Sequence, residues 1–318
     1  MQQRMAVGGR FLLALASTVV LFIGGVGVPS VGLILLPLVA QPALVLGLKY
    51  GTAWGFGVLL AAPLLFVIFA DGGLALIYGV LALMAGLLFG LLGRLRAISS
   101  LVVVVAGAMF AASGALLFYF FGSWAAMVHD FRDSLNQQFL SAVRMQEKMG
   151  FPREGLDLLM QRTPQIIDVT LQLLPALALT CLAFVVLVNV LLLCRRFPER
   201  RAQWLSEASL REWKGPESMV WALIAAGFAL FVPGLEFARV FSLNVLLVAG
   251  ACYFAQGLAV VAYFFHKNNV PRFLRGLTYM LIVFQQIFTL MIAGLGLFDL
   301  WGDFRRLSKD NLTPSQAA

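Results

Sequence analysis

Amide side chains in the middle of long apolar runs are the residues of this chain best placed to do chemistry. Gln256 lies in the apolar run 241–265, and Gln285 and Gln286 lie in the next run, 277–298. An amide without a hydrogen-bond partner in hydrocarbon costs several kcal/mol. These amides must therefore bond a neighbouring helix, water in a cavity or a small uncharged or zwitterionic solute.

Asn244 and Tyr253 lie in the same run as Gln256 and extend this candidate ligand site. Asn244 precedes Gln256 by about three turns of helix, and Tyr253 supplies an aromatic wall beside it. Gln285 and Gln286 point about 100° apart on a helix, so only one of them can easily face Gln256. The pattern predicts either a solute pocket or hydrogen bonds that hold neighbouring helices together.

Charged and aromatic residues next to the apolar runs are candidates for docking a partner protein. They are Trp213 and Lys214 before one run, and Asp299, Trp301, Asp303 and Arg305 at the end of the last run. The spacing of Asp303 and Arg306 suits an ion pair on one helix face. The alternative is a structural membrane boundary, with tryptophan at the level of the headgroups.

The sequence contains no motif for catalysis or metal binding. It lacks HExxH, GxSxG, a Walker lysine loop and paired intramembrane aspartates. His129 and His266 are too few for a histidine metal site, and the cysteines have no paired spacing. We expect a protein without enzymatic activity, without a metal and without a cofactor.

Membrane helices are the elements that must position these residues. The 318 residues are 61% hydrophobic and 12% charged, about half the charge of a soluble domain. Runs of about 20 apolar residues can cross a bilayer, and such runs occupy 11–28, 31–48, 52–70, 73–92, 101–121, 169–193, 218–235, 241–265 and 277–298. We expect an all-α polytopic transmembrane helical bundle of eight or nine spans in a single domain, 1–318. Glycines and Pro29 divide the first two runs, which form either two helices or one helix and a re-entrant segment.

Basic residues predict the orientation of the chain. The net charge of +8 comes from residues that flank the spans and form no continuous stripe for nucleic acid. They lie on one side if every span crosses, and the positive-inside rule makes that side, with the N-terminus, cytoplasmic. Nine crossings place the tail 299–318 outside, whereas its Arg305, Arg306 and Lys309 favour the inside.

Two polar segments lie between the spans. Residues 124–168 are amphipathic and predict an extracytoplasmic helical hairpin, broken at Gly150 and ending in a short helix before Pro164. This hairpin either lies on the outer surface or closes over an outward-facing pocket. Residues 195–217 form a cytoplasmic loop.

Three C-terminal motifs resemble the YybS-like family of bacterial membrane proteins: LREWKxPE at 210–217, YFAQGLAV at 253–260 and GLFDxWxDFR at 296–305. The N-terminal pattern, PLxxxP at 37–42 followed by LKYG at 48–51, is also similar to the substrate-binding subunits of energy-coupling-factor vitamin transporters. This resemblance implies an inner-membrane protein that binds a micronutrient. It also implies a transmembrane coupling protein and ATPases as partners. The competing hypothesis is a non-transporting scaffold that recruits cell-envelope proteins through its loops and tail.

Overall fold

The computed structural model describes residues 2–69, 72–150, 153–206, 211, 213–232, 234 and 236–305. Helices make up nearly all of these ranges, and no strand occurs in them. The all-α class expected from the apolar runs is therefore confirmed. The predicted pair of Asp303 with Arg306 and most of the tail, 306–318, lie outside the described residues.

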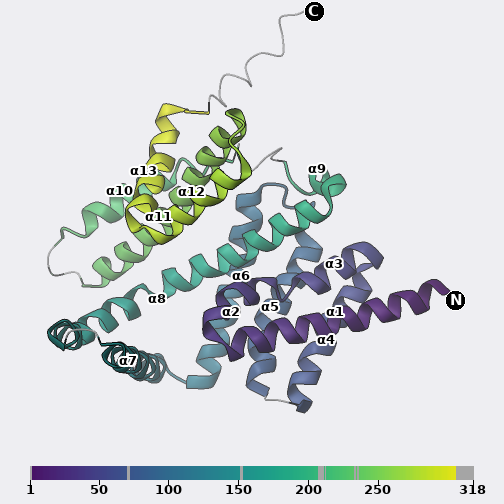
Figure 1. The fold of residues 1–318 in the computed structure, drawn as a ribbon, viewed down its shortest axis with the longest axis horizontal. Coiled ribbons are helices and arrows are strands. Elements are labelled where there is room, and N and C mark those ends of the chain that lie inside the picture. Colours follow the sequence, from purple (N-terminus) through teal and green to yellow (C-terminus); the bar gives the residue numbers. More distant parts are fainter. Residues whose placement is uncertain are drawn as a thin grey trace, which may run out of the picture. The chain divides into compact units, whose positions relative to one another are not determined.

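Most of the helices follow one another with short connections (Figure 1). The N-terminal part contains α1 (Gln2–Gly27), α2 (Pro29–Leu35), the 3₁₀ turn η1 (Leu36–Leu38), α3 (Gln41–Tyr50), α4 (Thr52–Phe69), α5 (Gly72–Leu91) and α6 (Ile98–Phe121). The remainder contains α7 (Trp124–Lys148), α8 (Arg153–Arg196), η2 (Pro198–Arg200), α9 (Arg201–Trp204), α10 (Met219–Ala229), α11 (Glu236–Lys267), α12 (Arg272–Phe284) and α13 (Gln286–Gly302).

Seven helices of the described chain are long and apolar enough to cross a membrane, and α12 with α13 adds an eighth if the pair forms one span. The count meets the expected eight spans and falls short of nine. The ninth would require α10 to cross alone, but its 11 residues extend only about 17 Å, against roughly 30 Å of hydrocarbon. The expected single helix over 277–298 is broken at Gln285, where the helix axes bend by 103°.

The first two apolar runs form α1 and the broken helix of α2, η1 and α3, and both are long and apolar enough to cross a membrane. The chain turns between Gly27 and Pro29, and α2 packs back against α1. A Cβ atom on Gly32 would lie 2.3 Å from the carbonyl oxygen of Gly25. Only glycine allows the two backbones to approach so closely.

Amide side chains hold the second span where it changes from α2 to α3. Asn189 of α8 is fully buried, and its Nδ2 donates to the carbonyl of Pro37 at 2.8 Å. Gln41 Nε2 in turn donates to Asn189 Oδ1 at 2.8 Å. This amide pair supplies the hydrogen bonds that lipid cannot.

The first helix expected in the segment 124–168 is α7, and the second continues beyond its expected end. Helix α7 ends before Gly150, which has φ of +83°, and Arg132 pairs with Asp168 of α8 at 2.6 Å. The second helix was expected to end before Pro164, but α8 continues through Pro164 and Pro175 for 44 residues. Membrane helices accept proline where other groups bond the freed backbone.

The internal contacts of the chain divide it into two compact units, and the single transmembrane domain 1–318 stays a prediction. Unit 1 contains residues 1–130 and 181–206, and unit 2 contains residues 131–180 and 207–318. In unit 1 the rings of Phe22, Phe66 and Tyr78 form a buried aromatic core with centroids 4.8 to 5.5 Å apart.

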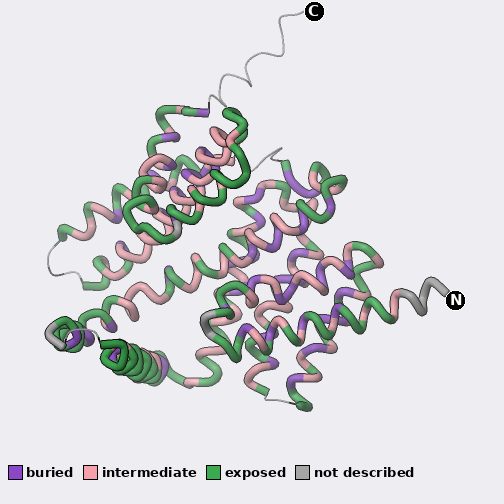
Figure 2. The backbone as a smooth tube through the Cα atoms, in the orientation of Figure 1, coloured by how far each residue is buried: buried purple, intermediate pink, exposed green. Residues whose placement is uncertain are grey.

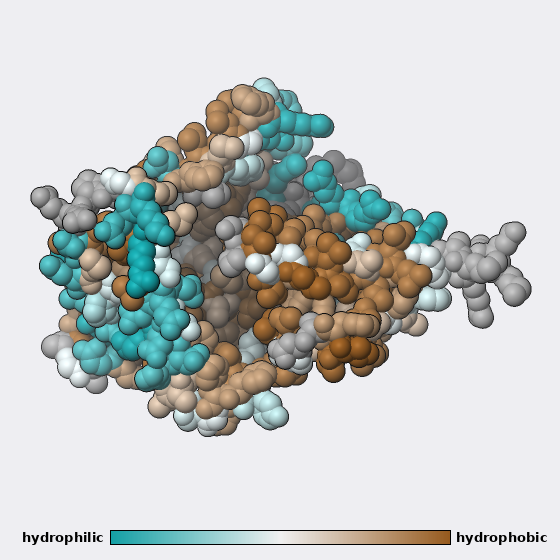
Figure 3. Space-filling view, turned by 60° about the horizontal axis from the view of Figure 1, so that its bottom comes forward, coloured by the Kyte–Doolittle hydropathy of each residue, from teal (hydrophilic) through white to brown (hydrophobic). Residues whose placement is uncertain are grey.

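Exposed residues occur along many helices (Figure 2), and hydrophobic residues cover large areas of the face shown in Figure 3. Leu33 and Phe69 of unit 1 are 80% and 81% exposed, and Phe237 and Phe273 of unit 2 are 85% and 82% exposed. Apolar exposure on this scale suits contact with lipid. Many helices therefore pack against their neighbours on one face only and leave the other face to the bilayer.

Candidate functional site

Helices α11 and α13 form the base of the candidate site, and two glycines bring them into backbone contact. A Cβ atom on Gly257 would lie 1.9 Å from the carbonyl oxygen of Ile292, and one on Gly296 would lie 2.0 Å from that of Tyr253. Gly257 faces Ile292 and Tyr253 faces Gly296, so residue numbers that increase along α11 decrease along α13. The two helices are therefore antiparallel.

The start of α10 and the end of α13 meet at the middle of α11. Val220 of α10 packs with Ala249 and Tyr253 of α11, and Leu297 and Leu300 of α13 join the same cluster. The segment 213–218 that precedes α10 is not helical. Gly215 in this segment lies against Cys252 and Gln256, in the middle of the apolar run 241–265.

Gln256 is fully buried and links this segment to α13. Its Oε1 accepts a hydrogen bond from the backbone N–H of Gly215 at 3.0 Å. Its Nε2 donates to Asp299 Oδ2 at 3.2 Å. The glutamine at the centre of the predicted site is therefore buried and hydrogen bonded, and its partners are a backbone amide and a carboxylate.

Asp299 and Arg305 form a buried ion pair. Arg305 Nη2 lies 2.6 Å from Asp299 Oδ2, and both side chains are completely shielded from solvent. Arg305 Nη1 also donates to the carbonyls of Arg211 and Trp213. Removing one charge of such a pair leaves the other uncompensated, at a cost of about 3–5 kcal/mol.

A second, partly exposed pair lies beside the buried one. Lys214 Nζ is 2.9 Å from Asp303 Oδ1, with 31% and 25% of the two side chains exposed. Asp303 ends α13 in a left-handed conformation, with φ of +36°. Because the chain turns there, Arg305 can reach back to Asp299, six residues earlier.

Four buried polar atoms in this part of unit 2 have no hydrogen-bond partner among the described residues. They are Trp213 Nε1, Tyr253 Oη, Asp299 Oδ1 and Arg305 Nε. Buried polar atoms in proteins are nearly always satisfied by protein, water, an ion or a ligand. We call Trp213, Gly215, Tyr253, Gln256, Asp299 and Arg305 together the polar junction.

Asn244 does not belong to the polar junction, and its side chain bonds backbone groups of α8. Its Oδ1 accepts from the backbone N–H of Ala176 at 2.9 Å, and its Nδ2 donates to the carbonyl of Gln172 at 2.8 Å. These are the groups that an i to i−4 hydrogen bond would join, one residue after Pro175. Asn244 thus stabilises α8 where proline disturbs it.

Gln285 and Gln286 are both exposed at the break between α12 and α13. The expected set of glutamines therefore does not converge, and only Gln256 belongs to the polar junction. The physical reason is the bend at Gln285, which turns α12 away from the axis of α13.

The residues predicted to dock a partner lie in different environments. Trp301 is 65% exposed, whereas Asp299 and Arg305 are 0% and 1% exposed. Burial removes these two charges from any surface that a partner could touch. Trp213 is half-buried, and Lys214 and Asp303 are bound to each other.

Sequence reasoning missed the buried ion pair and the role of Gly215. Asp299 and Arg305 are not spaced for a pair on one helix face, so the spacing carried no signal for it. Groups of three or more His, Cys, Asp or Glu that could hold a metal ion do not occur among the described residues.

Exposed apolar helices of crossing length and the buried polar contacts between them define a multi-pass integral membrane protein. Residues 16–300 match the model of the family described as predicted membrane protein (DUF2232), and the chain belongs to this family. No curated protein and no solved structure matches the chain.

Proposed function

We propose that this protein is a solute-binding or transport component of the bacterial inner membrane, with the polar junction as its binding site. The observation that carries the proposal is non-helical backbone, with a buried ion pair, at the middle of an apolar run. Non-helical backbone at membrane depth is tolerated only inside protein or beside a water-filled cavity. Transporters place such interrupted helices around their substrates.

The chemistry of the polar junction suits a small zwitterionic or uncharged solute. Asp299 Oδ1 has no hydrogen-bond partner among the described residues and can accept from an ammonium or hydroxyl group. Arg305 Nε and Trp213 Nε1 also have none among them and can donate to a carboxylate or carbonyl group. Together these groups bind both ends of such a solute, and they offer hydrogen bonds rather than a nucleophile. The protein is therefore proposed to bind its solute without a chemical reaction.

The sequence resemblance to energy-coupling-factor substrate subunits supports the same proposal. Under this hypothesis the chain delivers its solute through a separate coupling protein driven by ATPases. The basic flanks of the spans support a cytoplasmic N-terminus.

Native mass spectrometry of the protein, purified in a mild detergent from its own host, tests the proposal. A small molecule should accompany the wild-type protein and the Asn244→Leu variant, in which a structural amide of the same helix is lost. Gln256→Leu should lose it. An empty wild-type protein, or a small molecule retained by Gln256→Leu, would contradict the assignment.

Tyr253→Phe separates binding from folding. The Tyr253 hydroxyl is buried and has no partner in the described chain, so its removal should leave the free energy of unfolding nearly unchanged. Because the hydroxyl is proposed to bond the solute, the small molecule should be lost or bound more weakly. Unchanged retention of the small molecule would remove Tyr253 from the site.

A membrane scaffold is the second candidate function, and the exposure of Trp301 favours it. Trp301 is 65% exposed and precedes Asp303, the partner of the partly exposed Lys214, by two residues. A photo-crosslinking amino acid at position 301 should then capture a defined envelope protein, and the same residue at exposed Leu33 should capture only lipid. Only lipid adducts at both positions would argue against the scaffold.

A further inference from the structure

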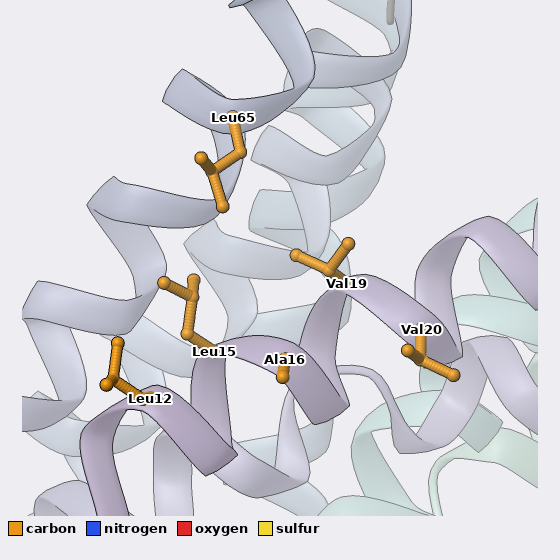
Figure 4. A pocket seen from close by; sticks show the side chains of 6 residues that line it. All are labelled: Leu12, Leu15, Ala16, Val19, Val20 and Leu65. Atoms are coloured by element: carbon orange, nitrogen blue, oxygen red, sulfur yellow. The ribbon is translucent and has the colours of Figure 1, made fainter. Parts of the chain in front are cut away.

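An open groove runs along α1 in unit 1 and is lined by aliphatic side chains. Its volume is about 440 Å³, and it is lined by Leu12, Leu15, Ala16, Val19 and Val20 of α1 and Leu65 of α4. Figure 4 shows Leu65 on one side of this space and Leu12, Leu15 and Val19 on the other. A groove of this composition accepts a hydrocarbon chain and offers nothing to a polar solute.

Cations lie at the end of α1 from which the groove starts. Arg10 precedes Leu12 by two positions, and its guanidinium lies 4.9 Å from the centre of the Tyr50 ring. Lys49 Nζ lies 5.6 Å from the centre of the same ring. Both cations are exposed, and within the described residues neither is in an ion pair with a carboxylate.

Further arginines extend this basic end across the tips of neighbouring helices. Arg200 donates to the carbonyl of Leu48, at the end of α3, at 2.9 Å. Arg96 donates to the carbonyl of Ala202 at 3.1 Å. These bonds join η2 to the end of α3, next to Lys49, and join α9 to the connection between α5 and α6.

We propose that unit 1 binds an anionic diacyl phospholipid, with its phosphate at Arg10 and Lys49 and an acyl chain in the groove of α1 and α4. The two cations share one aromatic ring, and an anion between them offsets their mutual repulsion. The groove lies within the membrane-spanning part of α1, so a phosphate at Arg10 places its acyl chains at the depth of the groove. Basic clusters between membrane helices bind such headgroups. The proposal is independent of the polar junction, which lies in unit 2.

The experiment is a native mass spectrometry titration of the delipidated full-length protein with phosphatidylglycerol, and with phosphatidylcholine of the same acyl chains. The wild-type protein should bind phosphatidylglycerol more tightly. The double variant Arg10→Gln, Lys49→Gln should bind it about 30-fold more weakly, on the order of fivefold for each cation. The matched control Arg144→Gln, Lys148→Gln removes two exposed cations of α7 and should bind as the wild type does.

A second pair of variants tests the groove. Ala16 is exposed and lines the groove, whereas Ala111 of α6 is exposed and does not. Ala16→Phe should fill the space and weaken lipid binding without disturbing the fold, and Ala111→Phe should not weaken it.

Any of four results would overturn the proposal. The first is equal affinity for the two lipids, and the second is unchanged binding in the Arg10 and Lys49 variant. The third is equal effects of Ala16→Phe and Ala111→Phe. The fourth is displacement of the lipid by an equal concentration of glycerol phosphate, which would indicate an anion site that does not use the groove.

Discussion

Breaking one side of the buried ion pair should strongly destabilise unit 2. Arg305→Met leaves the Asp299 carboxylate buried without its charge partner. Asp299→Leu likewise leaves the Arg305 guanidinium buried without a carboxylate. Each single substitution should cost about 3–5 kcal/mol of unfolding free energy. Asp299→Leu should lie at the lower end, because Arg305 keeps its bonds to the carbonyls of Arg211 and Trp213.

The double variant removes both charges and should cost less than the two single substitutions together. Replacing a buried pair by apolar side chains is often neutral or stabilising by about 1–4 kcal/mol. The carbonyls of Arg211 and Trp213 lose their donor, at about 1–3 kcal/mol each, in Arg305→Met as well as in the double variant, so this loss cancels when the variants are compared. The expected coupling between Asp299 and Arg305 is therefore at least about 2 kcal/mol.

Equilibrium unfolding in mixed micelles, followed by tryptophan fluorescence, measures the coupling as a double-mutant cycle. The matched control is the partly exposed pair, Lys214→Met with Asp303→Leu, whose coupling should stay below about 1 kcal/mol. If the Asp299 and Arg305 substitutions were additive within about 0.5 kcal/mol, the two charges would not depend on each other and the reasoning would be refuted.

Three further substitutions test the packing. Gly296→Ala should destabilise by about 1–3 kcal/mol in the same unfolding assay, because its Cβ meets helix backbone at 2.0 Å; Gly250→Ala meets nothing within 4 Å and should be neutral or slightly stabilising. Asn244→Leu should cost about 1–3 kcal/mol of unfolding free energy. The cost should be smaller in a Pro175→Ala background, because α8 can then form its own backbone hydrogen bonds. An equal cost in both backgrounds would show that Asn244 does not compensate for the proline. Asn189→Leu should lower the thermal unfolding temperature, and an unchanged temperature would show that its bond to η1 is unimportant.

The helical fold was predictable because lipid leaves an apolar run few alternatives to the helix. The same argument placed Gln256 correctly as a buried, hydrogen-bonded amide. Its partners were not predictable, since Gly215 and Asp299 lie 41 and 43 residues away along the chain. Only the tertiary packing of α10, α11 and α13 brings these groups together.

Breaks and continuations of helices were the least predictable features. Pro164 predicts a helix end, yet α8 passes through it, as helices in membranes can where the freed backbone groups find other partners. Conversely, nothing in the apolar composition around Gln285 marks the break between α12 and α13. This break leaves Gln285 and Gln286 exposed, so these two residues of the predicted site do not lie in the polar junction.

Water access to Cys252 tests most directly whether the polar junction is a binding site. Its Sγ lies 3.4 Å from the position of a Cβ atom on Gly215, so a reagent that enters the junction would modify it. Two single-cysteine proteins are needed, one with Cys252 alone and one with the exposed Cys181 alone. A small, charged methanethiosulfonate added from water should modify Cys252 faster than Cys181, which lies in the membrane run 169–193. If Cys252 stays unmodified while Cys181 reacts, the proposed binding site is contradicted. The polar junction is then a closed structural core.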